Sequence, residues 1–343
     1  MASSLCHILA NSFNILLASK YENIIHNLNT HTLLYQNLAS KDTLHKEAKG
    51  NCKILFIINP EAGDHSTDWP KEIEAYFSSL NHSIELYFLS SGFTMQLLKE
   101  KIGTFNPVKV VAVGGDGTVG LVAECLLQKN IPLGLLPAGS ANGLAKELGI
   151  SEVPQDALHT IIAGTVKKIH VTMINGRLCI HLSDIGFNAY MVKKFQSENI
   201  RGIWGYLKAT IEAAWSVLFI NQMMQVSMTI DNEIIETTAA MIVIANATRY
   251  GSGAVINPSG CMEDTLFEVI VVKKISVVEI FKMMVSHTSF NQDKTVVFQT
   301  RYLKMLPARK VHFQVDGEYL GKVNEIEAVL MPAAIKIIVP HVK

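Results

Sequence analysis

The stretch Val110-Val111-Ala112-Val113-Gly114-Gly115-Asp116-Gly117-Thr118 decides the fold that we expect for this chain. An apolar run ends at three glycines that bracket one aspartate, and a helical pattern follows from Val119 to about Leu127. This order predicts a strand, a tight turn and a helix. Glycine allows the backbone to approach a ligand closely, and the N–H groups at a helix N-terminus favour an anion. The stretch therefore predicts a phosphate site, and its single carboxylate, Asp116, points to a bridging Mg²⁺.

Length and composition limit the class of protein. The chain has 343 residues, of which 49% are hydrophobic, with 30 basic and 30 acidic residues. That length allows two domains of about 100–200 residues each. A formal net charge of zero argues against an overall electrostatic grip on nucleic acid, so we expect no nucleic-acid partner. The five cysteines are scattered without CxxC spacing, which indicates reduced thiols and a cytoplasmic protein.

The first half of the chain alternates between apolar strands and helical patterns. We expect an α/β domain over residues 51–168, in which a parallel sheet carries helices on both faces. In such sheets ligands bind beyond the carboxyl ends of the strands. The four expected strands are Lys53–Ile58, Ile84–Leu89, Lys109–Val113 and Ile131–Leu136. Residues 1–50 precede this domain as an N-terminal extension with one amphipathic helix. The chain has no apolar run of the ~18 residues that a spanning helix requires.

The second half, residues 169–343, reads as many short strands separated by turn signals. This pattern predicts an antiparallel sandwich or barrel. We expect Glu236–Ala245 to form one strand, and Pro332 to separate a strand over 326–330 from the last strand over 335–339. Two helices, over about 203–219 and 277–287, interrupt the strands.

Three turns rich in Gly and Asn follow strands of the α/β half: Asn59–Gly63, Gly114–Thr118 and Pro137–Asn142. Any one of them alone is most simply a turn. Three at strand ends in one domain favour a shared phosphate site. The turns do not match the GxxxxGK[ST] loop or the GxGxxG dinucleotide fingerprint, so they cradle phosphate in another way.

Carboxylates in the second half have two readings. Asp316-Gly317-Glu318 is either a hairpin turn, for which Asp-Gly is a strong signal, or a carboxylate pair at a strand end. In the second reading Asp316 takes the proton from an acceptor hydroxyl and Glu318 helps to hold Mg²⁺. The residues alone favour neither reading. Glu263-Asp264 is likewise either a solvated loop or part of a metal site.

Together these residues resemble the diacylglycerol kinase catalytic-domain superfamily, which includes sphingosine kinases and bacterial soluble lipid kinases. The resemblance runs from about residue 53 to the C-terminus, and its motifs are specific only in combination. The matching pieces are Asn59-Pro60-x-x-Gly63, the GGDGT turn, Leu136 to Ala145, Asp184-Ile185-Gly186-Phe187, Arg201 to Leu207, Asn246 with Gly251-Ser252-Gly253, Pro258 to Val269, and Val315-Asp316-Gly317-Glu318.

The resemblance implies a Rossmann-like nucleotide domain followed by a β-sandwich lipid-substrate domain, with the active site in the cleft between them. It implies transfer of the γ-phosphoryl of ATP, with Mg²⁺, to the hydroxyl of a lipid such as diacylglycerol or a sphingoid base. The implied catalytic residues are Asp316, as the base, and Asp116, and the implied metal-linked residues are Asp116, Asp264 and Glu318. The implied nucleotide-binding residues are Asn59, Gly63, Gly114, Gly115, Gly117, Thr118, Pro137, Gly139, Ser140 and Asn142.

The chain departs from the family pattern at several positions. Gly120 and Leu121 replace the Asn and Glu that often follow GGDGT, and Thr265 replaces the glycine of a DDG loop. Ser140 and Gly143 replace the Thr and Asp of GTxND, which brings the segment closer to sphingosine kinases. NAD kinase, which shares the GGDGT turn, is the enzymatic alternative, and a non-catalytic lipid- or nucleotide-binding module is another. A lipid kinase would contact the membrane surface peripherally. The sequence leaves the oligomeric state open, with a homodimer as one option.

Overall fold

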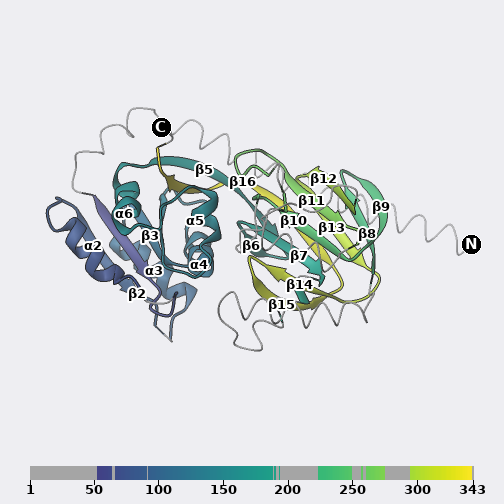
Figure 1. Cartoon of the computed structure of the whole chain (residues 1–343), viewed down its shortest axis with the longest axis horizontal. Coiled ribbons are helices and arrows are strands. Elements are labelled where there is room, and N and C mark those ends of the chain that lie inside the picture. Colours follow the sequence, from purple (N-terminus) through teal and green to yellow (C-terminus); the bar gives the residue numbers. More distant parts are fainter. Residues whose placement is uncertain are drawn as a thin grey trace, which may run out of the picture. The chain divides into compact units, whose positions relative to one another are not determined.

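The structure is a computed structural model that describes residues 52–341, apart from 64–65, 91, 188, 191–192, 194–222, 249–255, 258–259 and 275–293. The expected extension over residues 1–50 and the expected helices over 203–219 and 277–287 lie outside the described residues. Residues 51–343 form one compact unit. Within it the structure confirms the α/β half followed by an antiparallel sandwich (Figure 1).

The α/β half is built on four parallel strands in the order β2-β1-β3-β4. These strands are β1 (Lys53–Ile58), β2 (Ser83–Phe88), β3 (Lys109–Gly114) and β4 (Leu133–Pro137). The helices are α2 (Trp69–Phe77), α3 (Met95–Phe105), α4 (Asp116–Leu126), α5 (Gly143–Glu147) and α6 (Pro154–Ala163). Helix α6 has no counterpart in the sequence prediction.

Both faces of this parallel sheet are covered, which explains why its strands read as continuous apolar runs. Ile54 and Phe56 point to one face and pack with Trp69 of α2 and with α6. Leu55 and Ile57 point to the other face and pack with α3 and α4. The turns that follow these strands therefore start from strand ends that are packed on both faces.

The second half adds a sandwich. One sheet has the order β12-β11-β10-β7-β14-β15 with antiparallel neighbours. Its strands are β7 (Leu182–Gly186), β10 (Met241–Ala245), β11 (Phe267–Val272), β12 (Thr295–Thr300), β14 (Val311–Val315) and β15 (Glu318–Val323). The facing strands are β5 (Thr165–Ile174), β6 (Arg177–Cys179), β8 (Met224–Ile230), β9 (Glu233–Ala239), β13 (Tyr302–Pro307) and β16 (Ile326–Val339). These facing strands belong to the same sheet as β1–β4.

Strand β16 joins the two halves. Its first part pairs with β13, and along its length it pairs with β5, both antiparallel. Near its end Ile337 pairs with Leu133 of β4 in parallel. The expected break at Pro332 is wrong as a strand boundary. The β5–β16 ladder instead shifts register between Met331 and Ile335, because proline has no N–H to donate to a ladder.

One further strand assignment is corrected. The expected single strand over Glu236–Ala245 is two strands, since β9 and β10 separate at Ala240 and pair in different sheets. An apolar run that changes sheet has no interruption in hydrophobicity at the corner, so the sequence pattern does not reveal it. Strands β13 and β15 were not among the expected strands.

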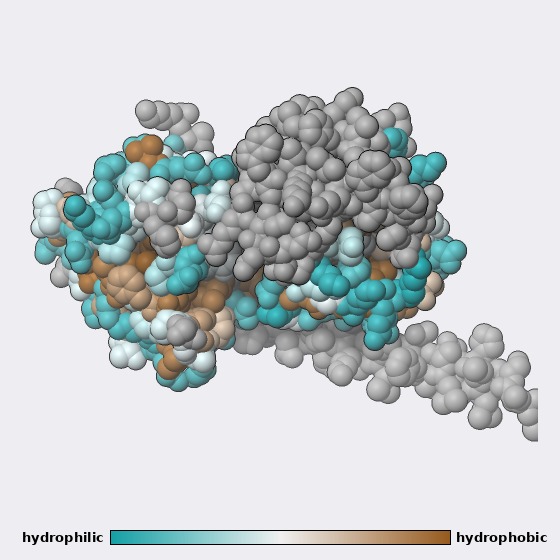
Figure 2. All heavy atoms as spheres, turned by 60° about the horizontal axis from the view of Figure 1, so that its bottom comes forward, coloured by the Kyte–Doolittle hydropathy of each residue, from teal (hydrophilic) through white to brown (hydrophobic). Residues whose placement is uncertain are grey.

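The described surface mixes polar and apolar side chains (Figure 2). Large apolar side chains that are exposed include Phe88 and Leu97 in the α/β half and Ile234, Val297 and Leu306 in the sandwich. Within the described part of the chain, no helix combines the length and hydrophobicity needed to cross a membrane.

Candidate active site

The first two of the three predicted turns are joined by a side-chain hydrogen bond. The Asn59 amide nitrogen, at the end of β1, donates to the Thr118 hydroxyl at 3.0 Å. The Asn59 backbone N–H donates to the Val113 carbonyl in β3, also at 3.0 Å. Thr118 lies in the first turn of α4 and is only 5% exposed. The carboxyl ends of β1 and β3 are therefore locked together, as the parallel sheet predicts.

Glycines bring the third turn against the other two. A Cβ atom on Gly63, which has a φ of +71°, would lie 2.1 Å from the Ala138 carbonyl oxygen. A Cβ atom on Gly139 would lie 2.4 Å from the Cα of Gly115, and one on Gly114 would lie 2.4 Å from the Thr118 hydroxyl. A residue with a side chain at any of these three positions would clash with the backbone or side chain beside it. Gly117 differs, since a Cβ atom there would meet no atom within 4 Å.

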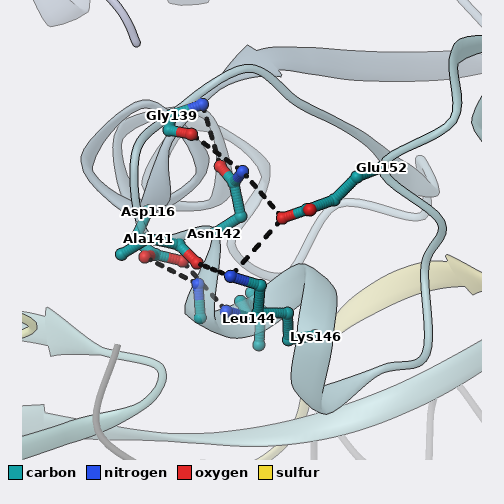
Figure 3. A network of polar contacts seen from close by, with 8 residues as sticks. Asp116, Gly139, Ala141, Asn142, Leu144, Lys146 and Glu152 are labelled. Atoms are coloured by element: carbon teal, nitrogen blue, oxygen red, sulfur yellow. Dashed lines mark hydrogen bonds and ion pairs between the residues drawn. The ribbon is translucent and has the colours of Figure 1, made fainter. Parts of the chain in front are cut away.

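The third turn is held by Asn142 (Figure 3). The Asn142 side chain accepts a hydrogen bond from the Gly139 N–H and donates one to the Gly139 carbonyl, both at 2.8 Å. Asn142 is buried and left-handed, with a φ of 51°. Ser140 is exposed within this loop, and Pro137 is buried at the end of β4, opposite Gly114. Asn142 therefore shapes the loop.

Asp116 connects the central turn to helix α5. Its two carboxylate oxygens accept hydrogen bonds from the backbone N–H groups of Gly143 and Leu144, each at 2.9 Å (Figure 3). An acidic group at a helix N-terminus is stabilised by the N–H groups that lack partners within the helix. Each oxygen keeps further acceptor capacity, because an ionised carboxylate offers about four lone-pair positions.

Asp316 lies in a cradle of backbone N–H groups. Its carboxylate accepts hydrogen bonds from the amides of Ile180 (2.8 Å), His181 (3.0 Å) and Leu182 (3.0 Å). The Cys179 thiol is 3.5 Å from the same carboxylate. Asp316 turns between β14 and β15 with a φ of 45°, so the hairpin that the sequence suggested is present. Burial raises the pKa of Asp316, against the opposing effect of the N–H donors.

The remaining predicted carboxylates are more peripheral. Asp264 accepts a hydrogen bond from the Leu266 N–H at 3.1 Å, and neighbouring Glu263 pairs with Lys167 at 2.6 Å. Glu318 is exposed at the start of β15. Among the described residues, no group of three or more His, Cys, Asp or Glu side chains is close enough to hold a metal ion. The structure therefore does not gather Asp116, Asp264 and Glu318 into one such cluster.

Residues 179–182 were not expected to take part in the site. They cradle Asp316 from more than 130 positions away in the chain. They act mainly through backbone N–H groups, which no motif of side chains can signal.

Comparisons with known proteins match each half of the chain to a protein family. The diacylglycerol kinase catalytic domain family matches residues 53–174, and the YegS C-terminal NAD kinase β-sandwich-like domain family matches residues 187–339. Lipid kinase YegS from Escherichia coli K12 is 27% identical over 249 residues, which cover 70% of this chain and 81% of YegS. An uncharacterised Synechocystis protein is 29% identical over 308 residues, with coverage of 83% and 70%.

A solved structure shares the fold. The crystal structure of a diacylglycerol kinase from Bacillus anthracis strain Sterne superposes with a TM-score of 0.61 at 18% identity, covering 84% of this chain and 96% of that one. The two family matches follow one another in the same order as the two halves of the structure. Residues 53–174 therefore carry a diacylglycerol kinase catalytic domain, and residues 187–339 carry a YegS C-terminal NAD kinase β-sandwich-like domain.

Proposed function

We propose that this protein is a lipid kinase that uses ATP and Mg²⁺ to phosphorylate the hydroxyl of a membrane lipid. The observation that carries the proposal is the convergence of three turns at one sheet edge. Asn59 meets Thr118, and Gly139 meets Gly115, so the two outer turns both pack on the GGDGT turn. The names of the relatives support a lipid as the acceptor.

The nucleotide fits this edge of the sheet. The N-terminus of α4 presents N–H groups at Gly115 to Thr118, which favour phosphate. A Cβ atom on Gly117 would meet no atom within 4 Å, so the space beside this turn is open. Ser140, which follows Gly139, is exposed. Asn59, Gly63, Gly114, Thr118, Pro137 and Asn142 hold the turns in place around the phosphates.

Mg²⁺ fits as a hydrated ion. This ion usually keeps several waters and binds through one or two carboxylates together with substrate phosphates, so a cluster of three carboxylates is not required. Asp116 keeps acceptor capacity beyond its two bonds to α5, and Glu318 is exposed. When bound, the ion would neutralise charge on the transferring phosphoryl group. We assign Asp116 to this ion as the direct carboxylate, with Asp264 and Glu318 acting through its waters.

Asp316 is the proposed base. Its Oδ2 atom accepts one hydrogen bond, from Ile180, and so retains room to accept the proton of a lipid hydroxyl. Burial raises the pKa of this carboxyl, which brings it nearer to the range useful for proton transfer. The cradle of three N–H groups fixes the orientation of the carboxylate, and positioning is the main protein contribution to phosphoryl transfer.

A lipid acceptor requires contact with a membrane surface. Apolar side chains that are exposed to solvent, such as Phe88 and Leu97, support shallow peripheral contact. We propose such contact for a cytoplasmic protein, without nucleic acid as a partner. Diacylglycerol and a sphingoid base are the two acceptor classes to test.

One experiment separates the candidate functions. The purified full chain is incubated with γ-labelled ATP, Mg²⁺, NAD and mixed vesicles that contain diacylglycerol and sphingosine. Labelled phospholipid supports the proposal, and its dependence on Mg²⁺ is checked by chelation. Labelled NADP would instead support NAD kinase, which the sandwich family match keeps as the second candidate. ATP binding without any labelled product would indicate a non-catalytic module.

A further inference from the structure

Carboxylates make hydrogen bonds at both ends of helix α5. At its N-terminus the Asp116 carboxylate accepts from Gly143 and Leu144. At its last residue, Glu147, the side-chain oxygens lie 2.7 Å from the Thr248 hydroxyl, and one accepts from the Thr248 N–H at 3.1 Å. Thr248 follows β10, so this contact joins the α/β half to the sandwich half.

The contact continues to the proposed base. The N–H groups of Asn246 and Ala247, just before Thr248, both donate to the His181 carbonyl, at 3.1 and 3.2 Å. The His181 N–H in turn donates to Asp316. A continuous series of hydrogen bonds and short chain segments therefore runs from Asp116 through α5 and Glu147 to Asp316.

We propose that Glu147 is a positioning residue, which sets the place of the Asp316 cradle relative to the nucleotide turn. This inference rests on the proposed function. It assigns to Glu147 a role in the transfer step, through Thr248 and residues 180–182, without contact with either substrate. A displacement of about 1 Å in reacting groups can cost ~100-fold in rate. Loss of the Glu147–Thr248 contact alone can therefore slow the transfer step.

The charge of Glu147 favours a positioning role for its contact with Thr248 over a contribution to helix packing alone. A carboxylate at the last residue of a helix is unfavourable for the helix dipole. Glu147 therefore gains little from its own helix, whereas the Thr248 N–H and hydroxyl together offer two donors to it. Hydrogen bonds to charged groups are about twice as strong as neutral ones.

The test compares Glu147→Ala, Thr248→Val, Thr248→Ser and the double variant Glu147→Ala/Thr248→Val. We expect kcat to fall about 10- to 100-fold in Glu147→Ala, with KM for ATP unchanged within about twofold. The fall in kcat should be smaller in Thr248→Val, because the backbone N–H of residue 248 still donates to Glu147. In Thr248→Ser, which keeps a hydroxyl, kcat should stay close to that of the parent protein. The kcat of the double variant should be no lower than that of Glu147→Ala. Once Glu147 is replaced by Ala, removal of the Thr248 hydroxyl breaks no further bond to it.

Glu72→Gln is the matched control. Glu72 accepts a hydrogen bond from Gln155 at 3.0 Å, and both residues lie in the α/β half. Its kcat should equal that of the parent protein. An unchanged kcat in Glu147→Ala, or a double variant whose loss is the product of the single losses, would overturn the proposal. Thr248→Val, a milder change, serves if Glu147→Ala does not fold.

Hydrogen exchange gives a second readout that needs no activity. The amides of residues 180–182 should exchange faster in Glu147→Ala than in the parent protein or in Glu72→Gln. If the parent protein phosphorylates no lipid, the proposed function fails, and exchange alone then decides on the link. Equal exchange at residues 180–182 in all three proteins would refute it.

Discussion

The Oδ1 atom of Asp116 lies 2.9 Å from the backbone nitrogen of Leu144, so the GGDGT turn holds the N-terminus of a helix 28 residues further along the chain. This contact gives the most recognisable aspartate of the sequence a structural task in addition to its proposed link to Mg²⁺. The two tasks can be separated by experiment, because helix capping acts without any ligand.

Replacement of Asp116 by Ala should destabilise the protein even without nucleotide. The change leaves the N–H groups of Gly143 and Leu144 without their charged acceptor, and we expect a loss of about 1–3 kcal/mol in the free energy of unfolding. Urea unfolding measures it. Glu124→Ala, on the exposed face of α4, is the control and should change stability by less than about 0.5 kcal/mol. An Asp116→Ala protein as stable as the parent would refute the capping role.

Replacement of Asp316 by Asn should abolish phosphate transfer while ATP binding persists. The loss of a general base typically costs ~10²–10⁴-fold in rate. The amide nitrogen of Asn would also face the N–H donors of the cradle, two of which bond one oxygen. Transfer rate and ATP affinity are measured on the same preparation, with exposed Glu233→Gln as the control. A fully active Asp316→Asn protein would remove Asp316 from the role of base.

Replacement of Gly139 by Ala should weaken ATP binding and stability together. The added methyl group would lie 2.4 Å from the Cα of Gly115, so one of the two turns must move. Strain of this kind costs about 1–3 kcal/mol. Gly103→Ala is the contrasting variant, because it lies in helix α3 with no atom within 4 Å of the new methyl group, and it should stabilise by about 0.5–1 kcal/mol. Titration with ATP and thermal unfolding test both variants.

His312 should make the protein sensitive to acid. Burial, with smaller contributions from Lys322 and Lys193, lowers its pKa from 6.5 to about 4. Between these two values the unfolded chain binds a proton that the folded protein resists, so stability falls as pH falls from 6.5 to 4 and this contribution levels off below 4.

The variant His312→Gln tests this prediction. It removes the titrating ring and retains a polar group for Tyr319, whose hydroxyl lies 2.8 Å from the His312 Nδ1 atom. Urea unfolding at neutral pH and near pH 4.5 should show a smaller loss of stability on acidification than in the parent protein. An equal loss in both proteins would mean that other groups account for the acid sensitivity.

Much of the α/β half was predictable because its signals are local. The strand over Lys53–Ile58 was predicted with the bounds that the structure shows, since a buried parallel strand is apolar throughout. Proline and turn residues mark the ends of such strands. The three turns could be placed at one edge from parallel topology alone, and the Asn59–Thr118 bond confirms that the first two meet there.

Other features have no local signal. The change of sheet at Ala240 leaves the hydrophobic pattern uninterrupted, and the partner of β16 in the α/β half is decided by packing. The roles of Asp116, Asp264, Asp316 and Glu318 in binding metal and moving a proton stay predictions, which the substitutions above can test.

The sequence by itself determined the strand–turn–helix order, the three glycine-rich turns and the resemblance to lipid kinases, because each depends on residue type and on spacing over a few positions. Only the tertiary structure decided what each carboxylate contacts. Asp116 caps α5, Asp316 lies in the amides of residues 180–182, and Glu147 reaches Thr248 across the two halves. These contacts join segments far apart in the chain through backbone N–H groups, which every residue except proline carries, so side-chain motifs cannot specify them.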